Sequence, residues 1–181
     1  MKHKLFILIS FLLSSGTILN AQKNDVAIRK EYQRIENLKT LKIDSLTHIR
    51  GIDFNRGNSV DEKKYKIFKE KKKIVKIQYE EIGGIGNSNR EWNKRTIIYL
   101  KNDIPFFITE NTNGMMTLYL LEGGEKSEPY NETVEIYIYD WNNEKVKRVY
   151  NGNEAKPQMN ICKSCYEELI EKIKMEFNSK Q

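Results

Sequence analysis

The chain has 181 residues, a formal net charge of +6 at pH 7 and only two histidines, His3 and His48. This length suits a single domain with a core large enough to fold without a cofactor, and none is expected. The positive charge is small for a nucleic-acid binder, so that class of partner is not expected either. Scarce imidazole also disfavours hydrolytic triads and zinc sites.

The first 21 residues predict an export signal. Lys2 and Lys4 precede an apolar run, and a small residue at the predicted cleavage site, Ala21, ends the segment. A membrane anchor is the alternative, but Ser14–Thr17 interrupts the run, which is then too short for the ~20 apolar residues of a spanning helix. We therefore expect a signal peptide over residues 1–21 and a single α+β domain over residues 22–181, located in the periplasm or outside the cell.

Apolar side chains recur every three to five residues through residues 24–49, which predicts one amphipathic helix. Asn24 suits its start and Gly51 its end. A loop is expected from Gly51 to Ser59.

From about residue 63 the pattern favours β-strands, because apolar residues alternate and β-branched and aromatic residues are frequent. Turn-forming residues at 101–103, 111–114 and 141–143 predict hairpins, and residues 122–131 predict the longest loop. Short connections imply an antiparallel meander of about six to seven strands. The expected strands lie near residues 63–70, 73–82, 94–101, 104–110, 115–121, 132–140 and 145–150.

A second helix is predicted from Ser164, which forms a capping-box pattern with Glu167. Its apolar stripe comprises Tyr166, Leu169, Ile170, Ile173 and Phe177. The expected fold class is therefore α+β, with an N-terminal helix, the meander sheet and a C-terminal helix.

Cys162 and Cys165 form a C-x-x-C motif just before this helix. In an oxidising compartment the pair is predicted to be a structural disulfide. A redox-active pair is the alternative, since a helix start and Lys163 favour a thiolate, and a metal site is a further one. A thioredoxin-like unit would need more strands and helices after the motif than this chain has.

Two other motifs have ordinary interpretations. The lysine-rich stretch from Lys63 to Lys76 could grip an anionic polymer, but it is interpreted as a solvated edge strand. Gly83, Gly84 and Gly86 resemble a phosphate loop only superficially, since no helix is predicted after them, and a hairpin loop is expected instead.

The predicted function is non-catalytic binding of an envelope protein, glycan or lipid, with no catalytic residue assigned. Aromatic residues that dominate binding surfaces occur on the strands and in one turn, although they also suit cross-strand packing. Glu110, Glu135 and Asp140 are expected to lie on the same open face of the sheet as these aromatic residues. The alternatives are a thiol–disulfide or carboxylate-based envelope enzyme and a small lipid carrier. The possible binding face comprises Tyr99, Tyr119, Tyr137, Tyr139 and Trp141.

Overall fold

The structure is a computed structural model that describes residues 24–51, 60–85, 92–119, 121–151, 153–154 and 161–179. The predicted signal peptide lies outside these residues. The chain divides into two compact units, Met1–Leu38 and Lys39–Gln181, which are described separately. The first unit contains a helix over residues 24–36, and the second contains the sheet and the last helix.

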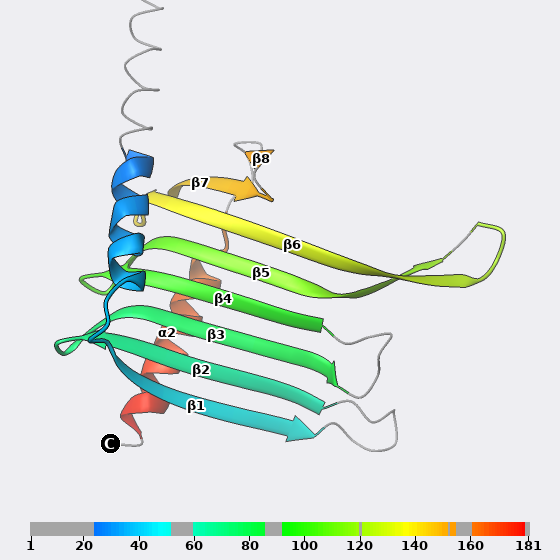
Figure 1. Ribbon diagram of the computed structural model, residues 1–181, viewed down its shortest axis with the longest axis horizontal. Coiled ribbons are helices and arrows are strands. Elements are labelled where there is room, and N and C mark those ends of the chain that lie inside the picture. Colours follow the sequence, from blue (N-terminus) through cyan, green and yellow to red (C-terminus); the bar gives the residue numbers. More distant parts are fainter. Residues whose placement is uncertain are drawn as a thin grey trace, which may run out of the picture. The chain divides into compact units, whose positions relative to one another are not determined.

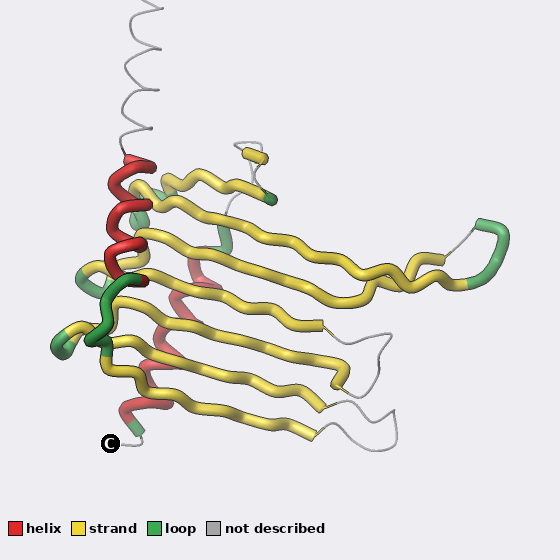
Figure 2. The backbone as a smooth tube through the Cα atoms, in the orientation of Figure 1, coloured by secondary structure: helices red, strands yellow, loops and turns green. Residues whose placement is uncertain are grey.

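The sheet is an antiparallel meander in which every strand pairs with the next one along the chain (Figures 1 and 2). Seven long strands are followed by a strand of two residues, which confirms the predicted meander and the α+β class. The strands are β1 (Lys42–Gly51), β2 (Val60–Glu70), β3 (Lys73–Ile85), β4 (Trp92–Lys101), β5 (Ile104–Tyr119), β6 (Glu125–Asp140), β7 (Lys145–Tyr150) and β8 (Asn153–Glu154).

The predicted helix over residues 24–49 is wrong in its second half. Residues 24–36 are helical, but Lys42–Gly51 form β1 and pair along their whole length with β2. Leu46, which the helical spacing had included, packs opposite Tyr65 in the core. Pairing with a neighbouring strand therefore overrides the local spacing of apolar residues, which fits a helix and a half-buried strand about equally over so short a segment.

The predicted hairpin at residues 111–114 and the predicted loop at residues 122–131 are also wrong. The asparagines of the first segment continue β5, and most of the second segment belongs to β6. Cross-strand hydrogen bonds satisfy these amides, as between Asn111 Nδ2 and Thr133 Oγ1 at 3.0 Å. Beyond Gly114, β5 and β6 pair only with each other among the described strands and form an arm that extends past the rest of the sheet (Figure 1).

Two other predicted hairpins are confirmed. Asn102 and Asp103 join β4 to β5, and both have positive φ, 51° and 64°, as a tight hairpin requires. Pro105 follows near a register shift at the start of β5, where a missing N–H is tolerated in an interior strand. At the β6–β7 turn, the Asp140 carboxylate accepts hydrogen bonds from the backbone and side chain of Asn143 at 3.1 and 2.7 Å.

A continuous row of isoleucines forms the centre of the core. Five isoleucines from successive strands lie opposite one another, and each is at most 1% exposed. Strand alternation places all of them on the face that the last helix, α2 (Lys163–Asn178), covers (Figure 1). The row comprises Ile67, Ile77, Ile98, Ile108 and Ile136.

Helix α2 buries the predicted stripe, with Tyr166, Ile170, Ile173 and Phe177 in the core and Leu169 packed against it. The predicted capping box is wrong. Cys162 is the N-cap and makes no side-chain cap hydrogen bond, so Ser164 lies inside the helix. Glu167 instead accepts a hydrogen bond from Trp141 Nε1 at 3.0 Å, which ties the helix to the β6–β7 turn. Among the described helices, none has the length and apolar character needed to cross a membrane.

Candidate functional site

A pocket of about 330 Å³ lies between the N-terminal half of α2 and the sheet. It forms beside the isoleucine row, where the next two rows of side chains on the same face of the sheet are polar. Tyr79, Thr96 and Glu110 lie opposite one another on β3, β4 and β5, and Glu81 lies opposite Lys94 in the next row. The strands therefore present a graded surface, from isoleucine through tyrosine and threonine to charged groups. The remaining lining residues are Arg148, Cys162, Cys165, Tyr166 and Leu169.

Tyr166 connects the helix to the charged groups of this pocket. Its ring is buried against the core, and its hydroxyl lies within hydrogen-bonding reach of Glu110 and Arg148. Burial is the main cause of the raised pKa of Tyr166, and the Glu110 carboxylate adds to it. The phenol therefore stays protonated over the physiological range and can both donate and accept a hydrogen bond.

Arg148 approaches the pocket from β7, opposite Ile136 of the isoleucine row. Its Nε is buried and makes no hydrogen bond within the described residues. A buried N–H without a partner is costly, and such groups are usually satisfied by water or by a ligand. Arg148 therefore brings to the wall of the pocket a guanidinium whose Nε is enclosed by protein atoms.

Tyr79 and Glu81 line the β3 side of the pocket. Burial, together with the neighbouring Glu81 carboxylate, raises the pKa of Tyr79 well above its ordinary value. The Tyr79 ring stacks on Tyr65 with centroids 5.2 Å apart, which fixes its position. Glu81 is held by Lys63 from β2 at 2.9 Å.

Lys94 and Glu110 form the second ion pair of the pocket, at 3.2 Å between β4 and β5. The charges that line the pocket therefore come as two carboxylates, Glu81 and Glu110, and two cations, Lys94 and Arg148. Such a lining carries no net formal charge but offers many donors and acceptors. Thr96, which is only 2% exposed, adds a hydroxyl to the lining of the pocket.

Cys162 and Cys165 form a disulfide on the helix side of the pocket, as predicted. The bond closes the turn that leads into α2, and both residues are exposed. It thus stabilises the start of the helix that carries Tyr166. Within the described residues, no cluster of three or more His, Cys, Asp or Glu residues has the arrangement of a metal site.

The five aromatic residues of the predicted binding face do not gather on one surface. Tyr99 and Tyr137 lie on the face opposite α2, where both rings pack against Phe107 with centroids 5.6 and 5.0 Å away. Tyr139 follows on β6, and Tyr119 lies in the β5–β6 arm. Trp141 belongs instead to the core beneath α2, because the register shift at the end of β6 changes the alternation of side chains.

The three carboxylates expected beside them are also separated. Glu135 accepts a hydrogen bond from the Tyr137 hydroxyl at 2.7 Å, as the shared face requires. Glu110 faces the α2 pocket, and Asp140 is occupied in the β6–β7 turn. The strand register places Glu110 and Glu135 on opposite faces of the sheet, so the single acidic face that the sequence suggested does not form.

The lysine-rich stretch is not an edge, because β1 lies outside β2. Lys69 binds Asp44 of the neighbouring β1 at 3.0 Å, and Lys64 binds Glu62 of its own strand at 2.8 Å. Lys76 Nζ lies 4.1 Å from the centroid of the Phe68 ring. These contacts account for the lysines as sheet-stabilising groups.

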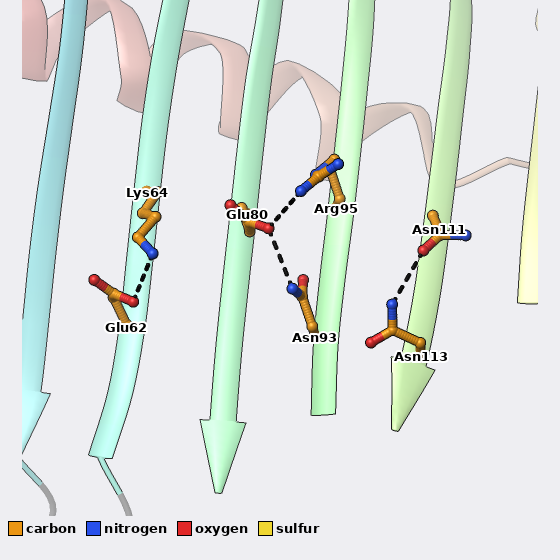
Figure 3. Close-up of polar contacts among 7 residues, drawn as sticks. All are labelled: Glu62, Lys64, Glu80, Asn93, Arg95, Asn111 and Asn113. Carbon is orange, nitrogen blue, oxygen red and sulfur yellow. Dashed lines mark hydrogen bonds and ion pairs between the residues drawn. The ribbon is translucent and has the colours of Figure 1, made fainter. Parts of the chain in front are cut away.

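A polar network crosses the sheet face opposite α2 (Figure 3). Glu80 on β3 accepts hydrogen bonds from Arg95 at 2.9 Å and from Asn93 at 3.1 Å, both on β4. Burial alone would raise the pKa of Glu80, but these hydrogen bonds outweigh it and lower the pKa below the ordinary 4.5. The ionised form is therefore the one that folding favours.

Replacing Glu80 with glutamine should lower thermal stability near neutral pH and have little effect in acid. Because the folded-state pKa is depressed, the stabilisation by Glu80 is fully present above pH 4.5 and is lost as the pH falls through the lower, folded value. Thermal unfolding of both proteins between pH 7 and pH 3 tests this. Glu125 is exposed, so Glu125→Gln should have nearly the same melting temperature as the wild type at every pH. If Glu80→Gln still melted well below the wild type at pH 3, the ionised Glu80 carboxylate would not be the source of the stabilisation.

The pocket residues were mostly missed by sequence reasoning, although the strand residues among them have a signal in retrospect. The sequence places Tyr166 in the apolar stripe alone and Glu110 on the open face of the sheet, and it assigns no role to Lys94. Their juxtaposition follows from the register of β3, β4 and β5, which places polar residues in consecutive rows. Arg148 had no local signal, because its significance depends on its position beside α2.

Comparison with known proteins gives no assignment: no family model matches the chain, and no curated protein or solved structure is significantly similar to it. The function is therefore inferred from the geometry of the site.

Proposed function

We propose that this is an exported, non-catalytic binding protein whose α2 pocket holds a small polar molecule that is uncharged or zwitterionic. The observation that carries the proposal is a pocket of about 330 Å³ whose lining combines two carboxylates, two cations and the hydroxyls of Tyr79, Thr96 and Tyr166. That volume is at the lower end of the range for small-molecule sites.

The charge pattern supports this class of ligand. Carboxylates and cations balance in the lining, so a strongly anionic or cationic ligand would leave one set of charges without compensation. The hydroxyls of Tyr79, Thr96 and Tyr166 add neutral donors and acceptors suited to a sugar or an amino acid. Tyr79 and Tyr166 also offer aromatic surface beside these polar groups.

The alternatives receive less support. A lipid carrier requires an apolar cavity, whereas the space between the sheet and α2 is occupied by the isoleucine row and the helix stripe, and the pocket beside it is polar. The pocket's two carboxylates, Glu81 and Glu110, are each held in an ion pair with a lysine, whereas a glycosidase needs two carboxyl groups that flank the scissile bond. The disulfide borders the pocket, as a thiol–disulfide enzyme would require, but within the described residues it follows an entirely antiparallel sheet.

Lys94→Gln should weaken ligand binding at least about tenfold, since a hydrogen bond to a charged group contributes about 1.5–3 kcal/mol. Arg95→Gln is a matched control: Arg95 is the next residue on the same strand, is also ion-paired, and faces away from the pocket. Thermal-shift and calorimetric titrations with neutral sugars and zwitterionic amino acids provide the measurement. A bound compound present at about 100 times its Kd should stabilise the wild type by about 2.7 kcal/mol.

The proposal fails if no compound of either class stabilises the protein and native mass spectrometry of freshly purified protein shows no bound small molecule. Equal loss of binding in Lys94→Gln and Arg95→Gln would likewise place the ligand elsewhere.

A further inference from the structure

The outer edge of β1 is unpaired within the described sheet. β1 is ten residues long, pairs on one side with β2, and contains no proline or register shift. It also exposes two large apolar side chains, Ile43 at 55% and Ile49 at 69%. Proteins usually protect such an edge, because its free backbone N–H and C=O groups can pair with another strand.

The geometry of a two-fold axis restricts how a second copy can pair with this edge. Two antiparallel edge strands are related by an axis perpendicular to the sheet, so paired residues must lie on the same face in both copies. Only every second register satisfies this condition. The allowed registers are centred on a residue that faces its own equivalent.

The register centred on Leu46 makes β1 complementary to itself. Ile43 then lies opposite the partner's Ile49, and both belong to the face away from α2. On the other face, Asp44 lies opposite the partner's His48. Each pair occurs twice because of the symmetry, and opposed apolar side chains stabilise a sheet.

The neighbouring allowed register lacks this match. Centring on Thr47 places Ile49 opposite the partner's Ser45 and Ile43 opposite the partner's Gly51, which separates the apolar side chains. In the Leu46 register Lys42 lies opposite the partner's Arg50 at the two ends of the interface.

We propose that the β1 edge is a homodimerisation surface whose occupant is β1 of a second copy, paired antiparallel about Leu46. The meander then continues across the two-fold axis, with each α2 on the same face of the combined sheet. Because one edge strand per copy provides a small interface, the dimer should be weak and concentration-dependent. This inference is independent of the proposed ligand pocket, which lies further along the sheet.

Sedimentation velocity over a wide concentration range measures the dimerisation. Ile49→Lys should weaken it roughly tenfold or more, since the change is present at two symmetry-related pairs. Ile104→Lys is the matched control, because Ile104 is similarly exposed, at 51%, but lies at the start of β5. Equal circular dichroism spectra and melting temperatures would show that both variants fold.

The register has its own test. When Ser45→Cys and Thr47→Cys proteins are mixed and oxidised, a cross-linked heterodimer should form, because these positions oppose each other in the Leu46 register. Monomeric protein at all concentrations up to about 1 mM, dimerisation unchanged by Ile49→Lys, or a dimer without this cross-link would each overturn the proposal.

Discussion

Ile77→Ala should lower the free energy of unfolding by about 2–5 kcal/mol, the range for truncating a fully buried aliphatic side chain. Ile77 is completely buried and lies in the isoleucine row between Ile67 and Ile98. Its neighbours are held by strand pairing on both sides, so the sheet cannot collapse into the space that the removed atoms leave. Urea denaturation followed by circular dichroism provides the measurement.

The control for this substitution is Ile104→Ala, which removes the same atoms from a side chain that is 51% exposed. We expect a loss several times smaller, since much less apolar surface returns to water. Similar losses at Ile77 and Ile104 would show that the isoleucine row is not the centre of the core.

Gly83→Ala should destabilise the protein by about 1–3 kcal/mol, as overpacking does in other well-packed sites. Gly83 is buried on β3 opposite Trp92 on β4. A Cβ atom at this position would lie 2.6 Å from Cζ2 of Trp92, so the indole ring would have to move. Glycine is therefore required here by the close approach of an aromatic ring, and the predicted hairpin-loop role of Gly83 is wrong.

A double-mutant cycle with Trp92→Ala separates this steric effect from a general loss of strand stability. With the indole removed, Gly83→Ala should cost little or become stabilising, because alanine suits a strand better than glycine. Thermal or urea unfolding of the four proteins gives the coupling energy. Additive losses would mean that the ring does not restrict residue 83.

The sequence predicted most of the central strands because their signals are strong and local. Val134, Ile136 and Ile138 alternate with polar or aromatic residues, and Asn102-Asp103 is a typical tight turn. The apolar stripe of α2 was likewise evident from its spacing. In each case the local preference agrees with the tertiary environment, so a short window of sequence contains enough information.

The errors occur where the local pattern permits two structures. Leu46 fits a helical stripe as well as a strand, and Asn111 to Gly114 are ordinary turn residues. Pairing with β2 decides the first case, and the long β5–β6 ladder decides the second. Hydrogen bonds and burial gained between segments distant in sequence outweigh preferences that amount to fractions of a kcal/mol per residue.

By itself the sequence determined the class of the fold, the order of most strands and the cysteine pair that forms the disulfide before the last helix. Only the tertiary structure decided which side chains meet. It separated Tyr99 and Tyr137 from Trp141, and it brought Arg148 of β7 to the same pocket as Tyr166 of α2. The reason is that strand register and helix placement, which depend on contacts across the whole sheet, determine the neighbours of every residue on a face.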